Sequence, residues 1–458
     1  MTVSNRLRDE LAALVGAENV LSDPPASYLS DATESRGVEG SAEAVVLPTT
    51  AEGVAGVVAW CYEHDVPVVP RGGGTGFAAG AVPVGHGIVL GLERLDRVRS
   101  FDPLLWRMNA EAGVRTAEVR RLARESGLVF PPDPGAAEQS QIGGNIATNA
   151  GGPHAFKYGV TGAWVLGLEA VVPPGELVSV GGAVRKDVAG YDLKSLLIGS
   201  EGTLGIVTAA WLRLLPAPEA SLPVAAFYDG AARGCEAIAR VYGSGIVAAA
   251  LEFLDAGALE AAGGSFPGGL PGGAGFLVLA EADGSVLEAK RVKSELLEAL
   301  DPDAIRVDAP NEAAAAAELW RWRDGVSIAV TARLGGKVSE DVVVPVDRLE
   351  EAIEGTLAVG ARHGLPACSW GHAGDGNLHS TLMLARDDED ALARAERASA
   401  ELFGLAVDLG GSISGEHGIG WTKRGQLSLQ LGPRALGLHA EVKKAFDPKG
   451  LMNPGKKT

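Results

Sequence analysis

Apolar residues recur along the first part of the chain at two spacings, which together predict alternating helices and strands. Residues 1–20 repeat leucines at helical spacing, as expected for a charged amphipathic helix. A capping-box pattern, Thr49-x-x-Glu52, predicts the start of a second helix. Short apolar and β-branched runs predict strands at residues 66–69, 88–90, 106–110, 165–172 and 177–180, the last two as a hairpin, and a helix at 116–126. The first part of the chain is therefore expected to be α/β or α+β.

Two prolines, Pro216 and Pro218, mark a change in the pattern. Beyond them, alanine-rich helical segments alternate with apolar runs, and residues 276–280 and 342–346 are predicted strands. We expect a second, α+β domain here that caps the first. The predicted division of the chain is residues 1–217, residues 218–408, and a C-terminal segment of residues 409–458.

Composition narrows the class of protein. The chain has 458 residues, 46% of them hydrophobic and 21% charged, which is ordinary for a soluble globular protein with more than one domain. A net charge of −18 argues against nucleic acid or an anionic membrane as the main partner. Only three cysteines occur, Cys61, Cys235 and Cys368, too few for a disulfide framework or an iron–sulfur cluster held by this chain alone. With no apolar run of roughly 18 residues and no signal-peptide pattern, the expectation is a cytoplasmic protein without a transmembrane segment.

A glycine-rich loop follows the predicted strand at residues 66–69. Glycines occupy positions 72, 73, 74 and 76, so the backbone can reach positive φ and present bare N–H groups to a ligand. A pyrophosphate is the simplest guest. The loop is neither a P-loop nor the Gly-x-Gly-x-x-Gly fingerprint of dinucleotide-binding helices. Taken alone, it is equally consistent with a tight surface turn.

A second stretch, residues 131–152, shows neither helical nor strand periodicity over more than twenty residues. Stretches of this length inside a compact domain are usually functional. Its small residues would let the backbone lie along a cofactor, to which Asn145 and Asn149 could donate side-chain amides. The alternative is a disordered linker.

Two short glycine-rich segments near the C-terminus concentrate histidines and a carboxylate. His372 and His379 flank one turn, and Glu416 and His417 lie between glycines in the other. Two imidazoles and a carboxylate with an open position are typical of a catalytic metal site. We therefore predict a divalent metal held by His372, His379 and Glu416, with zinc as the first choice and manganese, iron or cobalt as others. The alternative is a hydrogen-bonded loop network.

Five segments in order, residues 70–76, 142–152, 157–159, 188–192 and 199–208, resemble the flavin domain of the vanillyl-alcohol-oxidase/PCMH superfamily. The resemblance implies an α+β fold in which FAD lies between two α+β subdomains, an antiparallel cap domain covers the substrate, and the C-terminal segment returns to the flavin. The glycine loop lacks the histidine to which some members attach flavin, so a non-covalent cofactor is expected. The implied cofactor contacts in this part of the chain are Pro70, Arg71, Gly72, Gly73, Gly74, Thr75, Gly76, Pro132, Asp133, Gly143, Gly144, Asn145, Ala147, Thr148, Asn149, Gly151, Glu201, Gly202, Ile206 and Val207.

Residues 371–379, 415–420 and 446–456 are similar to the C-terminal half of the group that contains glycolate oxidase subunit GlcD, D-lactate dehydrogenase and D-2-hydroxyglutarate dehydrogenase. The similarity implies that His417 is the base, that Asn377 contacts substrate and that Asn453 touches the flavin. A Trp-x-x-Arg pattern places Arg323 on the substrate carboxylate, a bidentate role that suits a guanidinium. Lys337 is its predicted partner, although a solvated strand end would explain that lysine nearly as well.

The resemblance implies FAD-dependent, metal-assisted oxidation of a D-2-hydroxy acid, such as D-lactate, glycolate or D-2-hydroxyglutarate, to the 2-oxo acid. Two alternatives are a flavin-binding accessory subunit without chemistry of its own and a non-redox enzyme like the alkylglycerone-phosphate synthases. The electron acceptor would be oxygen, a quinone, a cytochrome or an electron-transfer flavoprotein. A homodimer or a complex with an iron–sulfur subunit is compatible with the pattern.

Overall fold

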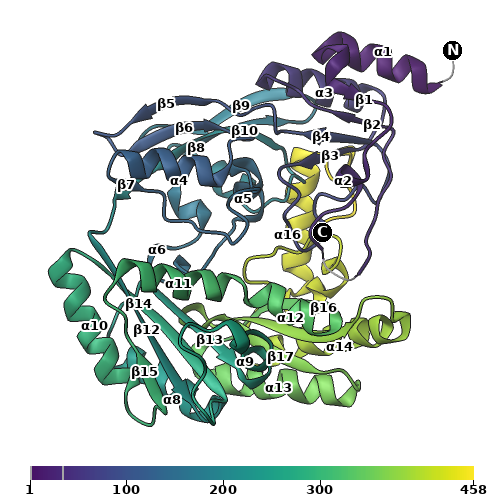
Figure 1. Ribbon diagram of the computed structural model, residues 1–458. Helices are drawn as coiled ribbons and strands as arrows, with labels where there is room; N and C mark the ends of the chain where they lie inside the picture. The colour runs from purple at the N-terminus through teal and green to yellow at the C-terminus, as the bar shows by residue number, and fades with distance from the viewer. Residues whose placement is uncertain (1–2, 34–35, 458) are drawn as a thin grey trace.

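The structure, a computed structural model, describes residues 3–33 and 36–457. Two halves, each built on a sheet or a pair of sheets with helices, are joined at residues 217–219, and a C-terminal segment packs against both (Figure 1). The fold class is α+β, as predicted. Within the described residues, no helix combines the length and the hydropathy that a membrane span requires.

The N-terminal sheet has the strand order β1-β2-β4-β3, and its last three strands run parallel. These strands are apolar and buried, as expected where both faces of a parallel sheet are covered. Helices α1 and α3 pack against each other and share one buried cluster with this sheet. The bounds are α1 (Val3–Val15), β1 (Val20–Leu21), α2 (Ala26–Leu29), β2 (Ala44–Val46), α3 (Ala51–Glu63), β3 (Val68–Arg71) and β4 (Ile88–Gly91).

The predicted bounds of two helices need adjustment. Helix α1 ends at Val15, short of residue 20, and residues 1–2 of the predicted helix lie outside the described residues. Helix α3 is capped by Thr50, whose hydroxyl accepts a hydrogen bond from the N–H of Gly53, so the predicted cap at Thr49 was wrong by one position. Because the helix begins at Ala51, only the side chain of Thr50 can reach the free N–H groups of the first turn.

The second sheet of the first half is antiparallel, in the order β5-β6-β10-β8-β9, and includes the predicted hairpin of β8 and β9. Its inner face packs on α4 and α5. A two-stranded β7·β11 pair lies beside it. The bounds are β5 (Val98–Asp102), β6 (Arg107–Glu111), α4 (Thr116–Glu125), β7 (Leu128–Val129), α5 (Ile142–Thr148), α6 (Ala155–Tyr158), β8 (Val165–Val172), β9 (Glu176–Gly181), α7 (Leu193–Leu197), β10 (Ile206–Arg213) and β11 (Leu215–Pro216).

The expectation that residues 131–152 lack regular structure was wrong for α5. This helix buries Ile142 and Ile146, one turn apart, in the core between the helix and the antiparallel sheet. Two glycines at positions 143 and 144 lower its intrinsic helix propensity and hid the pattern. Packing of the two isoleucines compensates for that low propensity.

The second half contains one seven-stranded, antiparallel sheet in the order β15-β12-β14-β13-β17-β18-β16. Helices α8, α10 and α13 cover one face, and α9, α11 and α12 cover the other, which is turned toward the first half (Figure 1). The strand bounds are β12 (Ala220–Tyr228), β13 (Ala250–Asp255), β14 (Phe276–Gly284), β15 (Arg306–Asp308), β16 (Gly335–Val343), β17 (Ala367–His372) and β18 (Asn377–Ala385). The helix bounds are α8 (Ala231–Gly243), α9 (Ala256–Ala262), α10 (Val286–Leu300), α11 (Ala313–Asp324), α12 (Val326–Leu334), α13 (Leu349–Arg362) and α14 (Glu389–Asp408).

The strand predicted at residues 342–346 is the end of β16, which stops at Val343. Pro345 has no N–H to donate, so the ladder cannot continue through it, and residues 346–348 form a short 3₁₀ turn. The predicted strand therefore extends too far by about three residues. The remaining residues of the prediction pair correctly with β18.

The C-terminal segment crosses back to the first half. Helices α15 (Leu427–Gln430) and α16 (Pro433–Phe446) lead to a strand-like contact in which Met452 pairs in parallel with Val68. Val442 and Phe446 of α16 pack on the core beneath the antiparallel sheet. The segment therefore brings residues 412–420 and the chain end to the seam between the halves.

Candidate active site

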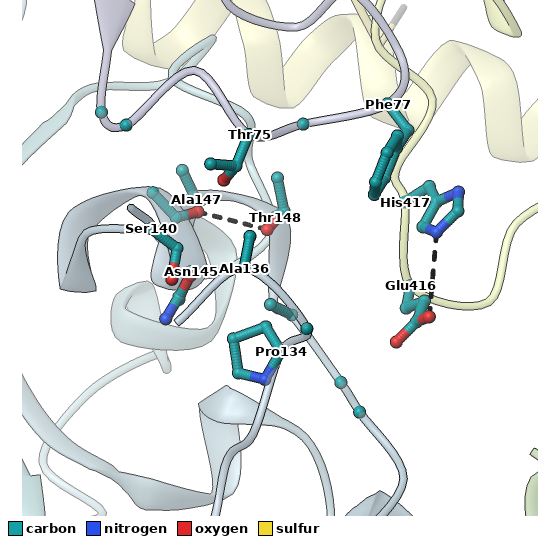
Figure 2. A pocket seen from close by; sticks show the side chains of 18 of the residues that line it. Thr75, Phe77, Pro134, Ala136, Ser140, Asn145, Ala147, Thr148, Glu416 and His417 are labelled. Atoms are coloured by element: carbon teal, nitrogen blue, oxygen red, sulfur yellow. Dashed lines mark hydrogen bonds and ion pairs between the residues drawn. The ribbon is translucent and has the colours of Figure 1, made fainter. Parts of the chain in front are cut away.

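A cavity of about 660 Å³ lies at this seam and is lined by all three parts of the chain. In Figure 2, Thr75, Asn145 and Thr148 of the first half lie on one side, and Glu416 and His417 of the C-terminal segment lie on the other. Residues of α11 and of strands β16 to β18 complete the wall. The sequence motifs, distant along the chain, therefore meet at one cavity.

The glycine loop forms a wall made of backbone. Residues 70–76 all line the cavity. A side chain on Gly73 would place its Cβ 2.1 Å from the carbonyl oxygen of Gln139, and Gly74 has φ +67°. A Cβ on Gly76 of the loop, or on Gly144 of α5, would in contrast meet no other protein atom within 4 Å, although both glycines line the cavity. The loop is thus packed tightly behind and bare in front, a cradle that fits a cofactor lying along the backbone.

Arg71 contributes backbone rather than charge to this wall. Its guanidinium donates to the carbonyl oxygens of Ser27 and Ser30, at 2.6 and 2.7 Å, and so ties the N-terminal segment to the loop. An anion at the loop would therefore be bound by backbone N–H groups and not by the Arg71 guanidinium.

Most of the predicted cofactor residues line the cavity, but three do not: Pro132, Asn149 and Asn453. Asn149 accepts a hydrogen bond from the N–H of Gly162, and the amide of Asn453 donates to the carbonyls of Gly80 and Glu201. These two asparagines hold loops together behind the wall. The predicted residues found on the wall are Pro70, Arg71, Gly72, Gly73, Gly74, Thr75, Gly76, Asp133, Gly143, Gly144, Asn145, Ala147, Thr148, Gly151, Glu201, Gly202, Ile206 and Val207.

Two of the wall residues use their side chains inside the protein. Asn145 donates one N–H of its amide to the hydroxyl of Thr116 at 2.7 Å. The amide has a second N–H, and its donation to a cofactor stays a prediction. The carboxylate of Glu201 accepts from the N–H groups of Ile419 and Gly420. Glu201 thereby ties the C-terminal segment to the first half.

His372, His379 and Glu416 converge as predicted. One potential ligand atom from each lies within 4.8 Å of the others, and the two histidines are buried. Nε2 of His372 is 3.4 Å, and Nε2 of His379 3.7 Å, from the same Glu416 oxygen. The histidines meet because they stand near the ends of the adjacent antiparallel strands β17 and β18, while Glu416 arrives from the C-terminal segment. This nitrogen and oxygen donor set fits a divalent metal.

The charges in this cluster are set by burial and by one another. Burial and the neighbouring His417 lower the pKa of His379 to about 3, which leaves a neutral imidazole, the form that binds metals. Burial opposes the charge on Glu416, but His372 and the other imidazoles lower its pKa to about 2. Against its burial, the carboxylates of Glu252 and Glu416 raise the pKa of His372 to about 10.

His417 stands between this cluster and the glycine loop. Its ring stacks on His379, with centroids 5.2 Å apart and planes 16° from parallel. It also faces Phe77, with centroids 4.7 Å apart (Figure 2). It lines the cavity and its side chain is partly exposed there. An imidazole in this position can exchange a proton with a ligand in the cavity.

Asp341, which the sequence patterns did not single out, organises the turn that carries Glu416 and His417. One of its oxygens accepts from the backbone N–H groups of Gly415, Glu416 and His417, at 2.8 to 3.0 Å, and from the Ser414 hydroxyl. Burial opposes the charge on Asp341, but the charges of His417 and Lys423 hold its pKa well below its usual value. Successive backbone N–H groups around one anion form a nest, and here the anion belongs to the protein.

Glu252 was also missed, although it interrupts an otherwise apolar run in β13. Its side chain is fully buried. One oxygen lies 2.7 Å from Nδ1 of His372, and the other accepts from Nε of Arg323 at 2.7 Å. Burial opposes the charge, yet Arg323 and His372 lower the pKa of Glu252.

The remaining predicted residues divide. Arg323 and Lys337 both line the cavity, and Lys337 donates to the carbonyl of Ser327 at 2.9 Å with its ammonium over the Trp370 ring. Asn377 does not line the cavity: its amide donates to Asp341 and to the carbonyl of Val342. The structure therefore places Asn377 behind the site, where it supports Asp341, rather than at the predicted contact with substrate.

Comparisons with known sequences match both halves of the chain. The family model described as "FAD binding domain" matches residues 42–181, and the model described as "FAD linked oxidases, C-terminal domain" matches residues 217–457. Glycolate oxidase subunit GlcD of Bacillus subtilis (strain 168) is 35% identical over 99% of this chain and 97% of its own length. A D-lactate dehydrogenase of Archaeoglobus fulgidus is 34% identical over 98% of both chains. The D-2-hydroxyglutarate dehydrogenase of rat mitochondria is 31% identical over 95% of this chain and 82% of its own length.

Solved structures share the fold at lower sequence identity. A p-cresol methylhydroxylase structure superposes with a TM-score of 0.83 at 17% identity, over 100% of this chain and 97% of that one. An alkyldihydroxyacetonephosphate synthase structure gives a TM-score of 0.77 at 17% identity, over 99% of this chain and 84% of that one. At this identity the likeness concerns the fold alone.

Proposed function

This chain belongs to the FAD-linked oxidase family, and from that premise we propose that it oxidises a D-2-hydroxy acid to the 2-oxo acid, with FAD as the hydride acceptor and a divalent metal at His372, His379 and Glu416. The convergence of these three residues and His417 at the cavity lined by the glycine loop is the observation that carries the proposal. The names of the relatives, all enzymes of small hydroxy acids or a subunit of one, support the substrate class.

The glycine loop and α5 would hold FAD. The bare backbone at Gly144 and at the loop glycines 72, 73, 74 and 76 suits the pyrophosphate, for which N–H groups are the donors. FAD supplies the redox chemistry by accepting the hydride from C2 of the substrate. The protein's part would be to orient that carbon toward the cofactor and to exclude water from the cavity.

His372, His379 and Glu416 would hold the metal, with zinc as the first choice among divalent ions. A metal in such a site acidifies an alcohol bound to it. With three protein ligands, the site leaves a position for the substrate hydroxyl.

His417 is the proposed base. Its ring lies beside the metal ligands and on the cavity wall, where it can take the proton of the substrate hydroxyl. Arg323 is the proposed partner of the substrate carboxylate, because its guanidinium lines the cavity close to the same cluster. Lys337 adds a second positive charge on that side.

Anaerobic bleaching of the flavin tests the function directly. The purified yellow protein is mixed with D-lactate, glycolate or D-2-hydroxyglutarate, before and after treatment with a metal chelator. We expect at least one of these acids to bleach the flavin and the chelator to slow that reaction. A flavin that none of them reduces would indicate an accessory subunit or a non-redox enzyme, and full activity after metal removal would refute the metal's role.

A further inference from the structure

The buried carboxylate of Glu252 connects the two sites that the substrate would use. It bonds Nδ1 of His372 through one oxygen and Nε of Arg323 through the other, each at 2.7 Å. Glu252 lies outside the sequence motifs described above and outside the three-residue metal cluster. Resting on the function proposed above, we propose that Glu252 is a positioning residue that holds His372 in the metal-binding tautomer and Arg323 in the carboxylate-binding orientation at the same time.

The chemistry of the two partners explains why a carboxylate is required. His372 must donate its Nδ1 proton to Glu252 in order to leave Nε2, the nitrogen that faces Glu416, for a metal. Arg323 is always charged and can only donate. Two donors therefore converge on one side chain, and among the residues of this size only an ionised carboxylate accepts at both ends.

Two neighbouring buried acids of the same sheet do not share this arrangement. Glu281 of β14 also bonds two partners, His154 and Trp320, but neither belongs to the metal cluster or to the proposed carboxylate site. Asp255, at the end of β13, caps α9 and accepts from the N–H of Ser369. Of these buried acids, only Glu252 joins a metal ligand to a cavity arginine.

Glu252→Gln separates this role from simple packing. A glutamine has one acceptor end and one donor end. Since Arg323 cannot give up its protons, it takes the carbonyl, and the amide NH₂ then faces Nδ1 of His372. His372 must accept there and carry its proton on Nε2, where the metal would bind. The affinity for Zn²⁺ should fall by about 10–100-fold, the usual range for a lost partner of a metal-binding histidine.

A second substitution should reverse the loss. In the double variant Glu252→Gln/Arg323→Met nothing binds the carbonyl end, so the glutamine can turn it toward His372 and accept its proton. The double variant should regain at least about tenfold of the lost Zn²⁺ affinity, even though it has lost another polar residue. It also removes the buried arginine that has lost its charged partner, so it remains measurable if the single variant fails to fold.

Zn²⁺ affinity is measured on the FAD-loaded protein by competition with a chromophoric chelator. Glu111→Gln is the matched control, because Glu111 is a buried glutamate bonded to Arg97 and Arg99 and is absent from the cavity wall. It should bind Zn²⁺ as the unmodified protein does. Unchanged affinity in Glu252→Gln, or no recovery in the double variant, would overturn the role of Glu252.

These measurements distinguish a failure of the role of Glu252 from a failure of the proposed function. If the unmodified protein binds no Zn²⁺, the metal centre and the role of Glu252 both fail. If Zn²⁺ binding follows the predicted pattern while no hydroxy acid bleaches the flavin, Glu252 keeps its role and the proposed reaction is wrong.

Discussion

The two walls of the cavity are built on opposite physical principles. The wall from the first half consists largely of backbone, and its key positions are glycines that lack a side chain. The wall from the second half and the C-terminal segment consists of buried ionisable side chains, each held by partners on other segments. The first wall depends on the absence of side chains, and the second depends on the pairing of buried charges.

This difference predicts how each wall responds to change. A methyl group added to a glycine of the backbone wall would clash with the protein only where other protein atoms lie close to that glycine. At the remaining glycines it would instead extend into the space that a cofactor would occupy. Removing one partner from the ionic wall leaves a buried charge without compensation, which is costly wherever it occurs. The four predictions below test this contrast, from the largest expected effect to the smallest.

Asp341→Asn should have the largest effect. The substitution turns one carboxylate oxygen of Asp341 into an NH₂ group and removes the negative charge. The N–H groups of Gly415, Glu416 and His417 would then lose the anion that they surround. Breaking a buried charged network of this kind costs about 3–5 kcal/mol. We expect that loss in urea unfolding, together with loss of bound metal and turnover. Ser414→Ala removes a single donor and should cost only about 1 kcal/mol, and equal stability of the two variants would contradict the nest.

His417→Gln should leave a folded, yellow protein with little turnover. A positioned acid–base group contributes about 10²–10⁴-fold to the rate. The His417 side chain is partly exposed and lies 3.8 Å from the Glu416 carboxylate, whereas that of His372 is buried and hydrogen-bonded to Glu252. Steady-state kinetics with a dye acceptor measures kcat, and the flavin absorbance reports folding. Near-normal turnover would refute the assignment of the base.

Gly73→Ala tests the backbone wall. The added Cβ would lie 2.1 Å from the carbonyl oxygen of Gln139, so the loop must move, at a cost of about 1–3 kcal/mol in loop distortion. Part of that cost should appear as weaker FAD binding, measured by fluorescence titration of the apoprotein. Gly76→Ala is the control, since its Cβ would meet no protein atom within 4 Å. A loss of FAD confined to Gly76→Ala would show that crowding by the cofactor matters more than crowding by protein.

The smallest expected effect is a pH dependence of the stability that His154 contributes at the seam between the two halves. His154 of the first half lies 2.5 Å from Asp133 and 3.0 Å from Glu281 of the second half. Burial opposes its charge, but these carboxylates hold the pKa of His154 well above 6.5. The unfolded chain has the lower pKa, so the stabilisation is complete below about pH 6.5 and is lost as the pH rises through the native value.

The difference in Tm between the unmodified protein and His154→Gln should therefore be largest near pH 6, at about 2–4 °C, and should shrink on the alkaline side. A difference that grows with pH would show that the imidazole is not held as a cation. Differential scanning calorimetry at several pH values measures it.

Local patterns predicted much of the fold and part of the site. The strands β4, β8 and β14 and the turn around His372 and His379 follow from the spacing of apolar and glycine residues, because that spacing acts within one element. The convergence of Glu416 with the two histidines was predicted from residue type and confirmed in space. Helix α5 was missed because tertiary packing overrides its glycines.

The pairing of distant charges was beyond the reach of those patterns. Glu252, Arg323 and His372 come from three separate elements, and only the pairing of β13 with β17 and the packing of α11 against the sheet bring their side chains together. Asn377 and Asn453 carry the expected residue types, yet the folded chain turns their amides to carbonyls and a carboxylate behind the wall. Residue type determines which hydrogen bonds a side chain can form, and the sequence alone gives the residue type. Which partner comes within 3 Å depends on how strands far apart in sequence lie side by side, and only the folded arrangement decides it.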